Sequence, residues 1–243
     1  PETEFSTLPV RSPFVPAEVE DLPELYSYHP LSRRSMAYGW RYLRRSMATG
    51  VADLLDVQAT VEQVAKQGFF LAPVYRRREI NQAQLLLLVD QGGSMTPFHR
   101  FTHDLVETAL APGVFPDGQV QVGYFHNFPT EYLYLDDHLT LPKAMSELLA
   151  DCDRETSVMI LSDAGAARGY RRMERIRKTT EFLVKLKRYS GLISWLNPMP
   201  RDRWQGSSAE VIAYLVSMEQ MDTEGLGNAI DVVRGQSVVL GNR

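Results

Sequence analysis

The sequence contains one cysteine, Cys152, among its 243 residues. A single cysteine excludes an internal disulfide and a zinc site made of several cysteines. The cytoplasm is the expected location, because disulfides are a feature of oxidising compartments. Long apolar runs are also missing: residues 69–73 and 85–89 have the length of a strand, whereas a membrane-spanning helix needs roughly 20 apolar residues. We therefore expect no membrane segment.

The chain also lacks a large net charge. The formal net charge of −4 excludes a general attraction to nucleic acids or to anionic membranes. Hydrophobic residues make up 44% of the chain, which is too many for a disordered protein. A chain of 243 residues is long enough for one α/β domain with an additional segment, or for two small domains.

The common enzyme motifs are missing too. The sequence has neither a Gly-x-x-x-x-Gly-Lys phosphate loop nor a Gly-x-Gly-x-x-Gly turn after a strand. Residues 92–96 are close to the Gly-x-Ser-x-Gly turn of α/β-hydrolases, but all five histidines precede Asp163, so none can follow the acid as that order requires. A haloacid dehalogenase-type phosphatase needs a second carboxylate two residues after Asp90, where Gly92 stands. We therefore predict that the protein is not an enzyme.

The texture of the sequence divides the chain into three parts. Five prolines in residues 1–27 predict a tail or linker, either mobile or draped over the domain. Residues 28–80 are predicted to form a small helical segment, with one helix at 31–47 and a second that begins at the N-cap Asp56 and ends at Gly68. Residues 81–243 are predicted to form the main domain.

In the main domain, short apolar runs alternate with amphipathic stretches. The predicted strands are 84–90, 119–125, 131–135, 157–163 and 191–197, with a short edge strand between the last two helices. The predicted helices are 97–111, 142–150, 169–189, 207–216 and 224–234. This alternation predicts a Rossmann-like α/β fold, which is a mostly parallel sheet with helices on both faces.

Polar residues end three of the predicted strands, namely Asp90, Asp163 and Asn197. Function gathers at the carboxyl ends of the strands in such sheets. Residues 90–95 place an acidic residue, a glycine turn and the hydroxyl of Ser94 in succession. Oxygen atoms at alternate positions of a turn, together with a second carboxylate from another strand end, suit Mg²⁺. The same loop is also typical of a plain strand-to-helix turn in which Ser94 caps the helix.

This arrangement resembles the metal-ion-dependent adhesion site of von Willebrand factor A domains. That site combines an Asp-x-Ser-x-Ser loop after the first strand, a threonine from a second loop and an aspartate that ends a later strand. Asp90, Ser94 and Asp163 match this pattern, and Gly92 replaces the middle hydroxyl.

The loop threonine of this pattern has two candidates: Thr140 is the first choice and Thr130 the second. The resemblance implies that Mg²⁺ or Mn²⁺ is held directly or through water, and that a carboxylate of a protein partner completes the coordination shell. The predicted metal ligands are Asp90, Ser94, Thr140 and Asp163.

A second stretch, the Trp-Leu-Asn-Pro of residues 195–198 with the Pro, Arg and Trp residues that follow it, is similar to the bacterial CoxE-like branch of this family. The resemblance covers roughly residues 84–235, a length typical of one domain. It implies an adaptor that works with a MoxR-type AAA+ ATPase. Arginine and tryptophan are favoured as interface anchors. The predicted partner-binding residues are Asn197, Arg201, Arg203 and Trp204.

Basic residues gather in the predicted helix 169–189 and at 76–78. Such clusters are either solvated faces or docking surfaces for an acidic partner or nucleic acid. The main functional prediction is a non-enzymatic protein-binding module. Three alternatives stay open: a metal-free scaffold that binds through the basic helix, a nucleic-acid-binding protein that uses residues 168–188 and 33–45, and a metal-dependent hydrolase.

Overall fold

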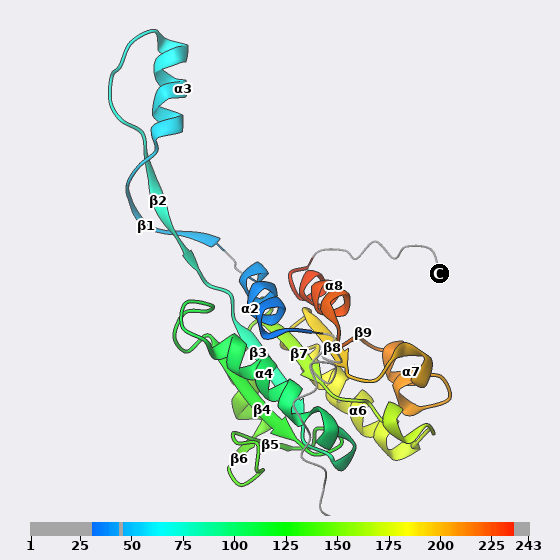
Figure 1. The fold of residues 1–243 in the computed structure, drawn as a ribbon. Helices are drawn as coiled ribbons and strands as arrows, with labels where there is room; N and C mark the ends of the chain where they lie inside the picture. The colour runs from blue at the N-terminus through cyan, green and yellow to red at the C-terminus, as the bar shows by residue number, and fades with distance from the viewer. Residues whose placement is uncertain (1–30, 44–45, 236–243) are drawn as a thin grey trace, which may run out of the picture. The chain divides into compact units, whose positions relative to one another are not determined.

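The main sheet of the protein has seven strands in the order β6-β5-β4-β3-β7-β8-β9 (Figure 1). It is seen in a computed structural model, which describes residues 31–43 and 46–235; the predicted tail at 1–27 lies outside them. The strands are β3 (Leu85–Asp90), β4 (Val120–Phe125), β5 (Tyr132–Tyr134), β6 (Pro142–Ala144), β7 (Ser157–Leu161), β8 (Ile193–Asn197) and β9 (Ser217–Gln220). The neighbours in the stretch β4-β3-β7-β8-β9 pair in parallel. Strand β5 pairs antiparallel with β4 and β6. The predicted α/β fold with a mostly parallel sheet is confirmed.

Helices cover both faces of this sheet (Figure 1). One face carries α2 (Arg33–Tyr42), α4 (His99–Leu110) and α8 (Thr223–Val233), and the other carries α5 (Met145–Ala150), α6 (Met173–Leu186) and α7 (Ser208–Ala213). The central strand β3 explains both cores. Its side chains point alternately to the two faces, so Leu85 and Leu87 join the first core while Leu86 and Leu88 join the second.

Helix α2 ends earlier than the sequence predicted, and β1 (Ser46–Leu55) begins where the helix 31–47 was expected to continue. The buried residues of α2, Met36 and Trp40, belong to the hydrophobic core on one face of the main sheet. The Trp40 indole nitrogen donates a hydrogen bond to Thr108 of α4 at 3.0 Å. The prediction of a helical N-terminal unit at 28–80 is therefore wrong, because α2 packs on the main domain and two strands follow it.

These two strands, β1 and β2 (Tyr75–Asn81), form a separate antiparallel pair with α3 (Val57–Gln67) between them. The ends of α3 are those predicted. Asp56 accepts a hydrogen bond from the backbone nitrogen of Ala59 at 2.9 Å, and Gly68 ends the helix in the left-handed region at φ 79°. No residue from 48 to 82 is buried by the described part of the chain.

Two further helix boundaries differ from the prediction. Residues 142–144, expected in the first turn of a helix, pair with β5 as the edge strand β6, where a proline without N–H is tolerated. The basic helix expected at 169–189 begins at Met173. Gly169, in the left-handed region at φ 71°, ends the short 3-10 helix η2 (Ala166–Arg168) and separates it from α6. The remaining 3-10 helices are η1 (Gly93–Phe98) and η3 (Arg201–Arg203).

Over the part of the chain that the structure describes, none of the helices combines the length and the apolar character required to cross a bilayer.

The contact between α8 and β9 depends on a glycine. A Cβ added at Gly225 would lie within the van der Waals radius of the Gln220 carbonyl oxygen, whereas one added at Gly227 meets nothing within 4 Å. We predict that Gly225→Ala lowers the free energy of unfolding by about 2 kcal/mol or more, because backbone cannot give way as a side chain can. Gly227→Ala is the matched control and should stabilise the helix by about 0.5–1 kcal/mol. Urea denaturation measures both, and equal effects would contradict this packing.

Candidate functional site

Three buried polar residues meet at the carboxyl edge of the sheet. Strand β3 lies between β4 and β7, so the chain leaves β3 toward one side of the sheet and later returns to build the other side. Such a topological switch point is where α/β sheets bind ligands. Asp90 ends β3, Asp163 follows β7 and Asn197 ends β8. All three are 0% exposed. Buried polar groups need hydrogen-bond partners, and these partners define what the site can do.

Asp90 is held by three donors. Its Oδ1 atom accepts from the backbone nitrogens of Gly92 at 2.7 Å and Asn127 at 2.8 Å, and its Oδ2 atom accepts from the Ser162 hydroxyl at 2.7 Å. Burial raises the pKa of Asp90 and the negative charge of Asp163 adds to this effect, whereas the three hydrogen bonds lower it. Asp90 thus joins the loops that follow β3, β4 and β7.

Asp163 organises the next loop along the edge. Its Oδ1 atom accepts from the backbone nitrogen of Gly165 at 3.0 Å, and its Oδ2 atom accepts from that of Ala167 at 3.2 Å. The amide of Asn197 donates to the Asp163 carbonyl oxygen at 3.0 Å. The carboxylate therefore shapes its own loop, while Asn197 ties that loop to β8.

A buried arginine completes the site. Arg175 of α6 has a side chain only 2% exposed. Its Nη1 atom lies 3.4 Å from Asp163 Oδ1, and its Nη2 atom donates to Asn127 Oδ1 at 2.9 Å. Burial lowers the pKa of Arg175, and the charges of Asp163 and Asp90 oppose that shift. Since a guanidinium stays protonated in proteins, the site contains a cation of its own.

The predicted metal ligands do not all come together. Ser94 lies in η1 directly after the Asp90 loop, and its hydroxyl oxygen is buried without a hydrogen-bond partner among the described residues. The Thr140 hydroxyl donates to Asp136 at 2.7 Å within its own loop. The Thr130 hydroxyl donates to the Tyr132 carbonyl oxygen at 3.3 Å. Both candidate threonines are thus engaged in local turns.

Most of the carboxylate oxygen lone pairs at this site are already used by protein donors. Asp90 Oδ1 and Asp163 Oδ1 each accept two hydrogen bonds, and each Oδ2 atom accepts one. The Arg175 guanidinium beside Asp163 repels a second cation in a site of low dielectric. The unpartnered Ser94 hydroxyl is the one feature that favours a ligand. Magnesium binding at this site therefore stays a prediction, and the positive charge of Arg175 disfavours it.

A second group of potential metal ligands lies on α4 and was not predicted. One ligand atom each from His103, Asp104 and Glu107 lies within 4.8 Å of the others. The carboxylates of Asp104 and Glu107 both bind the guanidinium of Arg33 in α2, and Arg33 Nη1 lies 2.8 Å from Glu107 Oε2. This group is an ion-pair network at the surface that joins α2 to α4.

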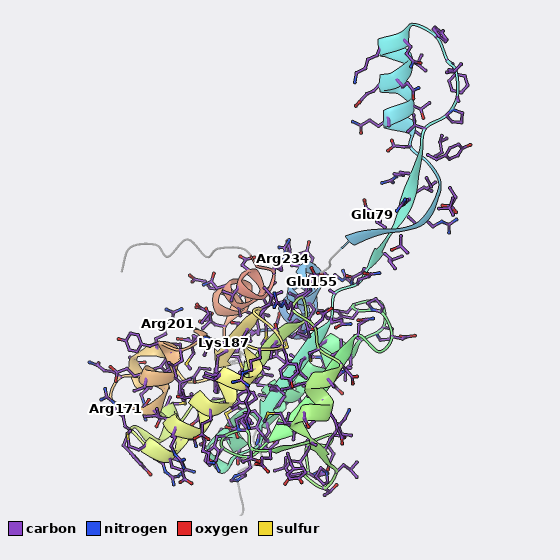
Figure 2. All side chains as sticks on the ribbon, turned by 180° about the vertical axis from the view of Figure 1, so that it is seen from behind. Glu79, Glu155, Arg171, Lys187, Arg201 and Arg234 are labelled. Carbon is purple, nitrogen blue, oxygen red and sulfur yellow. The ribbon has the colours of Figure 1, made fainter. Side chains whose placement is uncertain are left out.

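The four predicted partner-binding residues divide into two kinds. Asn197 is fully buried and Trp204 is 8% exposed; the Trp204 indole donates to the Met199 carbonyl oxygen at 2.9 Å. Both side chains hold the loop after β8, and their predicted contact with a partner stays a prediction that their burial does not favour. Arg201 is labelled in Figure 2. It pairs with Glu219, its Cζ atom lies 5.7 Å from the Trp204 ring centroid, and its side chain is 46% exposed. Arg203 is exposed and makes no ion pair with a described residue.

The loop before α6 is bound to the loop that follows η3. Arg171, labelled in Figure 2, donates to Glu210 of α7 at 2.8 Å, and Glu210 also accepts from the backbone nitrogen of Gly206 at 2.9 Å. The backbone nitrogen of Arg172 donates to the Ser208 hydroxyl at 2.9 Å. The two loops therefore form one surface at the carboxyl edge. We call it the edge surface; its exposed basic, aromatic and apolar members are Arg168, Tyr170, Arg171, Met173, Arg201 and Arg203, and the exposed acidic residues of the same stretches are Glu174 and Asp202.

Arg175 and Asn127 are the site residues that sequence reasoning missed. Arg175 was one of the basic residues of the predicted helix 169–189, but it precedes the buried Thr179, Phe182 and Leu183 by four, seven and eight residues. That spacing places it on the buried face of α6, which was a usable signal. Asn127 follows β4 with a positive φ of 64°, a conformation that asparagine tolerates and that the sequence alone does not reveal.

No protein-family model and no curated protein sequence matches this chain.

The Asp90 loop requires glycine at position 92. A Cβ there would lie 2.9 Å from Asp90 Oδ1 and 3.2 Å from Asn127 Oδ1, whereas one at Gly93 meets nothing within 4 Å. We predict that Gly92→Ser, which restores the hydroxyl of the family pattern, costs about 1–3 kcal/mol of stability. Gly93→Ser should change it by less than about 0.5 kcal/mol. Chemical denaturation compares the two variants, and a Gly92→Ser protein as stable as the native chain would show that the loop has room for a third ligand.

Proposed function

We propose that this chain is a von Willebrand factor A-type protein-binding module, a cytoplasmic adaptor rather than an enzyme, that binds its partner through the edge surface. The observation that carries this proposal is the contrast between two layers of the carboxyl edge. The carboxylates of Asp90 and Asp163 are buried and satisfied by protein donors. Arginine, tyrosine and methionine side chains are exposed nearby, in the loops after η2 and β8 and at the start of α6.

The position of the two aspartates supports the family assignment. Asp90 and Asp163 follow neighbouring parallel strands at the centre of the sheet, which is the placement that the family pattern implies. Ser94 follows Asp90 in the turn that opens η1. The partner that this branch of the family implies is a MoxR-type AAA+ ATPase.

The chemistry of the edge surface suits an acidic segment of a partner. Arginine and tyrosine are enriched among the residues that dominate binding energy at interfaces. Tyr170 is 53% and Met173 74% exposed, so both offer apolar contact area beside the arginines. Arg203 makes no ion pair within the described chain, and Arg168 makes only a long hydrogen bond of 3.5 Å to Asn127. Both guanidinium groups are available to carboxylates.

The hydrolase alternative finds less support at this site. A nucleophilic serine is activated by a base within hydrogen-bond reach. The Ser94 hydroxyl has no such partner among the described residues, and His126, which follows β4, is hydrogen-bonded to Asn127.

Charge reversal on the edge surface tests the proposal. The affinity of the full chain for a MoxR-type ATPase from the same genome is measured by isothermal titration calorimetry. We predict that Arg203→Glu and Arg168→Glu each weaken binding about tenfold, because each removes a contact with an acidic group and adds repulsion. Arg188→Glu is the matched control, since Arg188 is exposed just after the far end of α6.

Two results would contradict this proposal. Equal weakening by Arg188→Glu would mean that overall charge, and not the edge surface, drives association. Tight binding of DNA or RNA with a steep salt dependence would favour the nucleic-acid alternative instead.

A further inference from the structure

The carboxyl edge contains two buried carboxylates and one buried guanidinium, and the three groups form one network. We propose that Arg175 is the built-in cation of this site: it offsets one of the two buried negative charges and makes the edge surface independent of a divalent metal. The inference refines the proposed function, on which it rests for the identity of the surface. The charge balance itself is tested without any partner.

Charge balance explains why Arg175 is buried. Ionised carboxylates removed from water are stable only when they are paired or hydrogen-bonded. Arg175 reaches Asp163 directly, through Nη1 at 3.4 Å. It reaches Asp90 through Asn127, whose amide oxygen accepts from Arg175 at 2.9 Å and whose backbone nitrogen donates to Asp90 at 2.8 Å. One guanidinium therefore serves both acids.

The surrounding residues provide a path for this side chain. Gly165 has a φ of 87°, and a Cβ added there would lie 3.2 Å from Arg175 Cδ and 3.3 Å from Ser208 Cβ. A larger residue at 165 would therefore push against the arginine where it passes between the β7 loop and α7. Among the charged residues in the first turns of α6, the side chain of Arg175 is buried, whereas those of Glu174 and Arg177 are exposed. Burial therefore distinguishes Arg175 from the charged residues close to it.

Divalent ions gain little from such a site. The guanidinium beside Asp163 repels a divalent ion about as strongly as one carboxylate at the same distance attracts it, so it cancels much of the attraction of one of the two acids. A family site with a metal has the opposite requirement, since its acids stay uncompensated until the ion binds. The two arrangements therefore predict opposite responses to magnesium and to EDTA.

The melting temperature of the full chain distinguishes them. We expect the native protein to melt at the same temperature in millimolar MgCl₂, in MnCl₂ and in EDTA. Arg175→Met, which keeps the apolar stem and removes the charge, should lower the melting temperature by about 10 °C in EDTA. Magnesium should restore about 5 °C of that loss, because the acids then lack their cation. Arg177→Met, on the exposed face of the same helix, is the matched control and should change neither value.

A double variant separates charge from packing. If Arg175 acts through charge, Arg175→Met combined with Asp163→Asn should be more stable than Arg175→Met alone, because the unpaired acid is gone. A packing role would leave the double variant no more stable. Should Arg175→Met fail to fold, the native protein still decides: a melting temperature that rises with magnesium, and no longer rises in Asp90→Asn, overturns the proposal. These measurements contain no partner, so failure of the partner-binding test would contradict the proposed function and leave the role of Arg175 untouched.

Discussion

The rest of the carboxyl edge depends on one electrostatic constraint: two carboxylates are buried where parallel strands end. Asp90 and Asp163 have no access to water. Their charges are tolerated because backbone nitrogens, the Ser162 hydroxyl and the Arg175 guanidinium surround them. These donors come from the loops after β3, β4 and β7 and from α6, so satisfying the carboxylates also fixes the loops. The exposed arginines and Tyr170 stand on this fixed base.

Much of this architecture was predictable from the sequence, for reasons visible in β3 and α3. The apolar run at 85–89 is buried on both faces, so it needs no alternation and is recognised as a central parallel strand. Helix α3 has both of its signals in the sequence, a capping aspartate and a terminal glycine. The aspartates of the site were found because strand ends converge at one edge.

The errors have a common physical cause, which is that tertiary partners override local preference. The start of β1 was assigned to the preceding helix because its residues have no strand pattern of their own; its pairing with β2 decides the conformation. Likewise, Thr140 was the first choice for the loop threonine, but its hydroxyl donates to Asp136 in its own loop. Arg175 is indistinguishable by residue type from its basic neighbours, and only its register on α6 turns it inward.

We infer that a guanidinium, and not a metal ion, provides the positive charge beside Asp163. Anomalous diffraction from crystals of the full chain grown with MnCl₂ measures this directly, since manganese is located independently of the protein atoms. We expect no anomalous peak within coordination distance of Asp90 or Asp163, and the Arg175 side chain in hydrogen-bond contact with Asp163. A manganese peak bound to Asp90 and Asp163, with Arg175 displaced, would contradict it.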